Sequence, residues 1–133
     1  MSDPVPAALV KPVNAAVLAH VQSLSAHSDI VDLLSASLKP LGDVQLFCPD
    51  WQAYRYVVAS TQGVVFALAA GMHTIAVRLD SRMAPRALQT GAEPYADCGD
   101  GWVAVLHRTP DDDWPAVDLP FWMRKAYVYA RTL

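Results

Sequence analysis

The stretch that decides the fold covers residues 63–80 and reads Gly63-Val64-Val65-Phe66-Ala67-Leu68-Ala69-Ala70-Gly71-Met72-His73-Thr74-Ile75-Ala76-Val77-Arg78-Leu79-Asp80. It holds two apolar runs separated by a short turn at Gly71-Met72. Side chains along a strand alternate between its two faces, so every second residue of a run shares a face. That rule predicts one face with Val64, Phe66 and Leu68 from the first run and Ile75, Val77 and Leu79 from the second. We therefore predict that residues 64–70 and 73–79 pair as adjacent antiparallel strands at the centre of a sheet.

Length and composition indicate one globular domain. A chain of 133 residues suits a single core, and we take residues 1–133 as one domain. Hydrophobic residues make up 53% and charged residues 17%, which is typical of a folded rather than a disordered chain. We find no internal repeat and no linker that would divide it.

Charge and hydropathy argue against two classes of partner. The formal net charge is -3, whereas general nucleic-acid binders are usually basic because neutralising phosphates supplies most of their affinity. No apolar run reaches the ~18 residues that a membrane span needs, so we expect no membrane association.

The two cysteines, Cys48 and Cys98, have no metal-binding spacing. With no signal peptide visible, we expect free thiols in a reducing cytoplasm.

Helix periodicity and capping residues give the elements that precede the central pair. The Pro-rich lead over 1–12 is expected to be a flexible arm, because repeated prolines block helix formation. A helix is predicted over 14–25 with Asn14 as its N-cap, and Ser28 or Asp29 is predicted to cap the next helix.

The later elements complete the order α-α-β-β-β-β-α-β-α. Strands are predicted at 43–47, 53–59 and 102–108 beside the central pair, helices at 82–90 and 119–130, a polar loop at 93–101 and an acidic turn at 110–115. Asp80 or Ser81 would cap the first of these helices and Asp118 the second. Strands joined by short turns favour an antiparallel meander with the helices packed on one of its faces. The predicted fold class is therefore α+β, a single domain.

Five short runs occur in the order and at the spacing of a known family. Residues 38–44 read Leu-Lys-Pro-Leu-Gly-Asp-Val, residues 63–68 read Gly-Val-Val-Phe-Ala-Leu, residues 75–80 read Ile-Ala-Val-Arg-Leu-Asp, and residues 91–95 read Gly-Ala-Glu-Pro-Tyr. Together with the closing helix at 122–130, they resemble the TfoX N-terminal-like (YjbR-like) domains over about residues 29–132. Leu46-Phe47-Cys48-Pro49-Asp50 stands where that family carries Met-Phe-Gly-Gly. The resemblance implies a curved antiparallel sheet and a regulatory protein–protein role, as in the bacterial members named for competence regulation.

No pattern of residues predicts catalysis, a cofactor or a metal. His20 and His27 lie seven residues apart, and two histidines alone cannot fill a zinc site. The aspartates at 111–113 lack the alternating ligands, the glycine and the closing glutamate of a calcium loop. Acidic neighbours of Cys98 disfavour a nucleophilic thiolate. We therefore expect a protein that is not an enzyme and that holds no cofactor or catalytic metal.

A basic row and an apolar helix are the candidates for an interaction surface. Arg78, Arg82 and Arg86 follow one another at intervals of four, from the end of a strand onto a helix. They form either a solvated face or a docking surface for an acidic partner or an anion.

The closing helix is apolar almost all round, which indicates deep burial or a face covered by a partner. We expect part of this helix, centred on Trp122, Tyr129 and Leu133, to meet a second copy of the chain in a homodimer. The competing interpretation is that the helix fills a deep groove of its own fold.

These features favour a non-enzymatic regulatory or adaptor-type protein-interaction domain. The alternative is a small-ligand-binding domain with an aromatic pocket between sheet and helices. Its candidate lining residues, which otherwise belong to the core, are Trp51, Tyr54, Tyr56 and Trp102.

A core substitution tests the predicted hairpin. Replacing Phe66 with alanine should lower the free energy of unfolding by about 3–5 kcal/mol, because a buried ring is lost and a cavity remains. Urea unfolding of wild type and Phe66→Ala measures this difference, and a loss below about 1 kcal/mol would place Phe66 outside the core.

Overall fold

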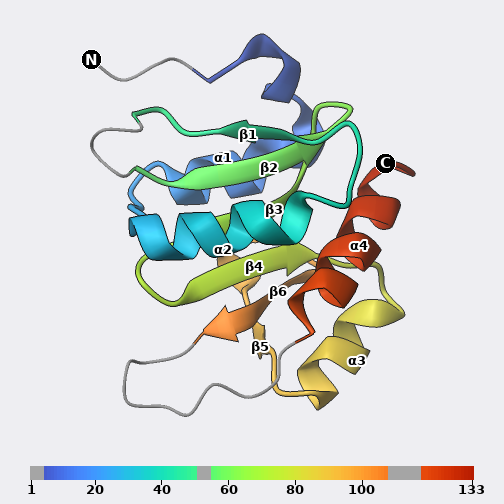
Figure 1. The fold of residues 1–133 in the computed structure, drawn as a ribbon. Helices are drawn as coiled ribbons and strands as arrows, with labels where there is room; N and C mark the ends of the chain where they lie inside the picture. The colour runs from blue at the N-terminus through green and yellow to red at the C-terminus, as the bar shows by residue number, and fades with distance from the viewer. Residues whose placement is uncertain (1–4, 51–54, 108–117) are drawn as a thin grey trace.

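A six-stranded antiparallel sheet in the order β1-β2-β3-β4-β6-β5 forms the middle of an α+β fold (Figure 1). The computed structural model describes residues 5–50, 55–107 and 118–133. The strands are β1 (Gln45–Phe47), β2 (Val57–Thr61), β3 (Val64–Ala70), β4 (Thr74–Arg78), β5 (Glu93–Pro94) and β6 (Trp102–His107). The helices are α1 (Ala15–Val21), α2 (Ser28–Leu38), α3 (Met83–Gln89) and α4 (Leu119–Ala130), with short 3-10 turns η1 (Ala7–Leu9), η2 (Pro12–Asn14) and η3 (Ala96–Cys98).

The central hairpin predicted from the sequence is confirmed. β3 and β4 pair antiparallel, from Ala67 opposite Val77 to Ala70 opposite Thr74. Strands β1 to β4 follow one another across the sheet as a meander. The meander then stops, because the chain crosses through α3 to the edge strand β5 and returns to place β6 beside β4. The short strand β5 lies where the sequence predicted only a polar loop.

The predicted alternation along β3 fails at one point. Ala59 of β2 pairs with Ala67, whereas the next residue, Ser60, pairs with Val65, so Phe66 is an extra residue in β3. Such a β-bulge turns two successive side chains to the same side. Phe66 and Ala67 accordingly belong to one core cluster, and Leu68 belongs to the cluster on the opposite face.

The expectation that helices cover only one face of the sheet is wrong. Figure 1 shows α2 and α4 in front of the sheet and α1 behind it. Two core clusters result, one containing buried residues of α2, α3 and α4 and the other containing buried residues of α1 and the 3-10 turns. The physical reason is that every residue of β2 and of β3 is buried, so neither face of these strands can meet water.

The first helix ends at Val21 rather than near residue 25. Asn14 occupies its N-cap position, as predicted, but makes no side-chain capping hydrogen bond to the helix. Its side chain is fully buried and bonds to backbone groups on two sides. The amide Nδ2 donates to the carbonyl oxygens of Leu9 at 2.7 Å and Gly63 at 2.8 Å, and Oδ1 accepts from the amide of Val65 at 2.9 Å. Asn14 therefore joins the chain ahead of α1 to the turn between β2 and β3.

The Pro-rich lead is docked where the structure describes it. Leu9 is buried in the α1-side cluster, and Lys11 Nζ donates to the carbonyl of Gln62 at 3.0 Å. The lead also packs against Gly63, where φ is +78° and an added Cβ would lie 2.6 Å from the carbonyl oxygen of Ala8. Only a glycine fits this turn.

The remaining caps are partly as predicted. Asp80 Oδ1 accepts from the amide of Met83 at 2.8 Å, and Asp118 Oδ1 accepts from that of Phe121 at 3.2 Å, as expected. His27, and not Ser28 or Asp29, is the N-cap of α2, where its ring nitrogen Nδ1 accepts from the amide of Asp29 at 3.1 Å. The start of the strand predicted over 53–59 and the acidic turn at 110–115 lie outside the described residues.

Replacing Asn14 tests this buried junction. Asn14→Ala should lower the free energy of unfolding by at least about 2 kcal/mol, because it leaves buried backbone donors and acceptors without partners. Asn14→Asp should cost at least as much, because a carboxylate cannot donate to the two carbonyl groups. Urea unfolding measures both, with the exposed Ser23→Ala as the control that should stay within about 0.5 kcal/mol of wild type. Asn14→Ala matching that control would contradict the junction.

Candidate functional site

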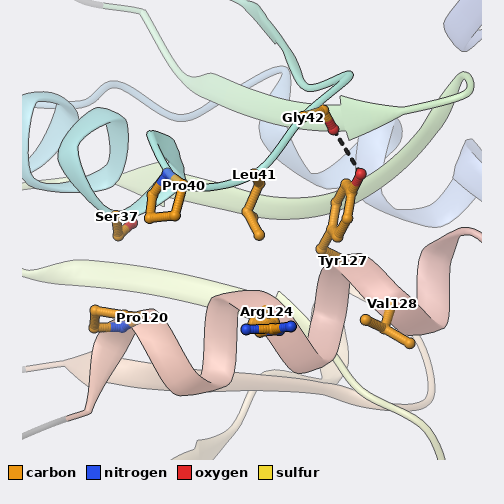
Figure 2. A pocket seen from close by; sticks show the side chains of 8 residues that line it. All are labelled: Ser37, Pro40, Leu41, Gly42, Pro120, Arg124, Tyr127 and Val128. Carbon is orange, nitrogen blue, oxygen red and sulfur yellow. Dashed lines mark hydrogen bonds between the residues drawn. The ribbon is translucent and has the colours of Figure 1, made fainter.

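Two surface hollows are the candidate sites. The first, named here the α2–α4 groove, has a volume of about 410 Å³ (Figure 2). It is lined by Ser37, Pro40, Leu41, Gly42, Pro120, Arg124, Tyr127 and Val128. The second, named the Arg78 hollow, has a volume of about 260 Å³. It is lined by Pro12, Val13, Ala16, Arg78, Cys98, Gly99, Asp100, Trp102, Tyr129 and Leu133.

Hydrogen bonds within the protein already occupy most polar groups of the α2–α4 groove. Figure 2 shows the Tyr127 hydroxyl pointing to the carbonyl oxygen of Gly42, to which it donates at 2.6 Å. The Ser37 hydroxyl donates to the carbonyl of Leu34 at 2.7 Å. Arg124 forms no hydrogen bond or ion pair with any of the residues that the structure describes. The groove thus presents apolar walls and Arg124, a cation that has no partner within the described ranges.

The last turn of α4 fixes Tyr127 in place. Arg131 Nη1 donates to the Tyr127 hydroxyl at 3.1 Å and to Thr61 Oγ1 at 3.0 Å. The same nitrogen lies 3.4 Å from Asp43 Oδ2. This network ties α4 both to β2 and to the loop after α2, so the two walls of the groove are held at a set separation.

The Arg78 hollow is built on two neighbouring residues of adjacent strands. Arg78 of β4 lies opposite Trp102 of β6, and its Cζ atom is 5.1 Å from the centre of the indole ring. Arg78 is only 6% exposed, and its Nη2 donates to the carbonyl of Val13 at 2.8 Å. Burial lowers the pKa of the Arg78 guanidinium, which nevertheless stays charged at neutral pH.

Both side chains at the base of the hollow lack a full set of partners. Within residues 5–50, 55–107 and 118–133, no carboxylate forms an ion pair with Arg78. The indole Nε1 of Trp102 is buried, and it finds no hydrogen-bond acceptor there either. Buried donors without acceptors are rare in folded proteins, so each needs an explanation.

The structure separates the three arginines that the sequence grouped together. Arg78 belongs to the α1 side of the sheet, since its strand neighbours Val77 and Leu79 face the opposite cluster. Arg82 and Arg86 are exposed beside and on α3, which packs on that opposite cluster. The expected basic surface is therefore reduced to two solvated side chains and one buried one.

The residues expected at a homodimer contact are also divided. Trp122 is 7% exposed and belongs to the core cluster under α4. Tyr129 is half-buried and Leu133 is 51% exposed, and both line the Arg78 hollow. Trp122 accordingly offers little surface to a second copy, whereas the end of α4 does.

Of the four aromatic residues expected to line a pocket, one borders a hollow in the structure. Trp51 and Tyr54 lie outside the described residues. Tyr56 is fully buried in the α1-side core, where it lines neither hollow, and only Trp102 borders one. Sequence reasoning did not pair Trp102 with Arg78, and it missed the α2–α4 groove. The sequence signal that could have located the Arg78 hollow was Arg78 itself, a charged residue at the end of a largely apolar strand.

The cysteines and the acidic and histidine side chains show no reactive cluster. Over the described ranges, no group of three or more His, Cys, Asp or Glu side chains could hold a metal ion. Cys48 and Cys98 are buried free thiols. Burial raises the pKa of Cys48, and burial together with the charge of Asp97 raises the pKa of Cys98 to about 12. Neither thiol therefore supplies an appreciable thiolate at neutral pH.

A membrane-crossing helix is not found in the part of the chain that the structure describes. Comparisons with protein families, curated proteins and solved structures gave no match to this chain. The resemblance to TfoX N-terminal-like domains accordingly stays a prediction.

Proposed function

We propose that this chain is a non-enzymatic regulatory or adaptor-type domain that docks an acidic, apolar segment of a partner protein in the α2–α4 groove. The observation that carries the proposal is Arg124, a cation without a partner among the described residues, set between the apolar walls of this groove.

The chemistry of the groove defines its occupant. Pro40, Leu41 and Val128 supply apolar walls, and the hydroxyls of Ser37 and Tyr127 are already bonded inside the protein. An occupant gains by burying apolar side chains there, and a carboxylate gains further by pairing with Arg124, which is exposed at the groove. A purely polar ligand would find few free hydrogen-bonding groups.

The surface next to the groove favours a chain segment over a small molecule. Phe121, which follows the lining residue Pro120 on α4, is 41% exposed, so apolar surface extends beyond the hollow itself. Exposed apolar surface of this kind is typical of protein contacts, and two helices that flank a groove are a common way to hold a peptide. The resemblance of residues 29–132 to a family with regulatory members supports the same proposal.

A charge reversal on α4 tests the proposal. Peptides of about 12 residues, long enough to cross such a groove, are selected from a random library on the wild-type protein, and their affinities are measured by fluorescence anisotropy. The selected peptides should combine acidic and apolar residues. Arg124→Glu should weaken their binding about tenfold or more, because it replaces an attraction by a repulsion. Arg86→Glu makes the same substitution at an exposed arginine of α3, outside the groove lining, and should bind within about twofold of wild type.

Two results would contradict the proposal. The first is a set of selected peptides that bind Arg124→Glu as well as they bind wild type. The second is a concentration-dependent dimer in light scattering that Val128→Glu dissociates while the protein stays folded. That result would assign the groove to a second copy of the chain instead of a partner segment.

A further inference from the structure

We infer that the Arg78 hollow is a binding site for a small organic carboxylate. This site shares no lining residue with the α2–α4 groove, so the inference stands independently of the function proposed above.

The first argument is the unpaired charge of Arg78. Arg78 is 6% exposed as a residue, and the structure gives its guanidinium, which has five N–H donors, one hydrogen bond, to the carbonyl of Val13. Buried cations are normally matched by an anion, because the loss of hydration is otherwise uncompensated. In the described ranges no side-chain carboxylate takes that place. An anionic ligand would supply the missing partner.

The second, independent argument is the indole N–H of Trp102. Nε1 can only donate a hydrogen bond, and it is buried with no acceptor among the described residues. Trp102 lies directly opposite Arg78 on the neighbouring strand, with its ring beneath the guanidinium, and both residues line the same hollow. A single anionic acceptor placed there could take hydrogen bonds from both side chains. One unsatisfied indole N–H and a neighbouring guanidinium with a single bond among the described residues point to an acceptor with more than one oxygen.

The walls of the hollow select an organic carboxylate over an inorganic anion. The planar fork of a guanidinium matches the two oxygens of a carboxylate. Asp100 also lines the hollow, and its negative charge opposes a multiply charged ion such as phosphate more than a single carboxylate. Apolar atoms of Val13, Ala16 and Leu133 suit a short hydrocarbon body. A volume of about 260 Å³ limits the ligand to a few carbons, since pockets for larger molecules usually exceed ~300 Å³.

The probe is isovalerate, with isovaleramide as its uncharged counterpart and inorganic phosphate as the purely ionic one. Each of the four tryptophans gives one indole N–H resonance, and the Trp102 signal is the one missing from Trp102→Phe. Isovalerate at ~10 mM, enough to occupy a millimolar site, should shift the Trp102 resonance in a saturable way. Isovaleramide and phosphate at the same concentration should not.

A pair of matched variants separates the site from the fold. Trp102→Phe keeps an aromatic ring and removes the N–H, so isovalerate should bind about tenfold more weakly in calorimetry, the loss expected for a hydrogen bond to a charged acceptor. Trp122→Phe makes the same change at a buried tryptophan outside the hollow and should leave the affinity unchanged. Trp102→Phe should unfold no more readily than Trp122→Phe, because its deleted donor has no acceptor among the described residues.

The inference is overturned by any of three results. Isovalerate leaves the Trp102 resonance unmoved, isovaleramide or phosphate binds as tightly as isovalerate, or Trp102→Phe binds isovalerate with wild-type affinity.

Discussion

The apolar character of β2 and β3 on both of their faces is the constraint on which the rest of the structure depends. Every residue of these two strands is buried, so the chain must supply a cover for each side of the sheet. Helices α2, α3 and α4 form one cover, and α1 with the 3-10 turns forms the other. Each candidate site is a consequence of this arrangement. The α2–α4 groove lies within the first cover, and the Arg78 hollow opens where the second cover meets the end of α4.

A buried polar residue holds the second cover in place. Helix α1 is short, and helices of this length are marginal in water unless tertiary contacts hold them. Asn14 supplies such contacts by bonding to Gly63 and Val65, and Arg78 adds another through the carbonyl of Val13. The same arginine thus stabilises the cover and forms the base of a hollow. Among the described residues Arg78 makes one hydrogen bond, so its structural role uses only part of its five donors.

Much of the fold could be predicted from the sequence, because its signals are local. The pairing of β3 with β4 and the caps at Asp80 and Asp118 depend on neighbouring residues, and they are confirmed. The prediction of one-sided packing was wrong because antiparallel meanders commonly leave one face to water, whereas the unbroken apolar run of β3 indicates burial on both sides. The bulge at Phe66 depends on register with β2, and no local pattern carries that information.

The candidate sites were harder to predict for the same physical reason. Spacing grouped Arg78 with Arg82 and Arg86, but the side chain of Arg78 points to the other face of the sheet, where its neighbour is Trp102 of a later strand. The groove depends on a hydrogen bond between Tyr127 and Gly42, two residues 85 positions apart. Contacts that join distant segments decide both hollows, and a single sequence does not display them.

The covering of the α1 side is tested most directly by hydrogen exchange at the amide of Val65, which donates to the buried side chain of Asn14 at 2.9 Å. If residues ahead of α1 close this face, the Val65 amide exchanges only when the whole domain unfolds, together with the slowest amides of the sheet. The opposite result is exchange of Val65 as fast as the exposed turn residue Met72, while other β3 amides remain protected. That result would show that the second face is open, and it would contradict the account.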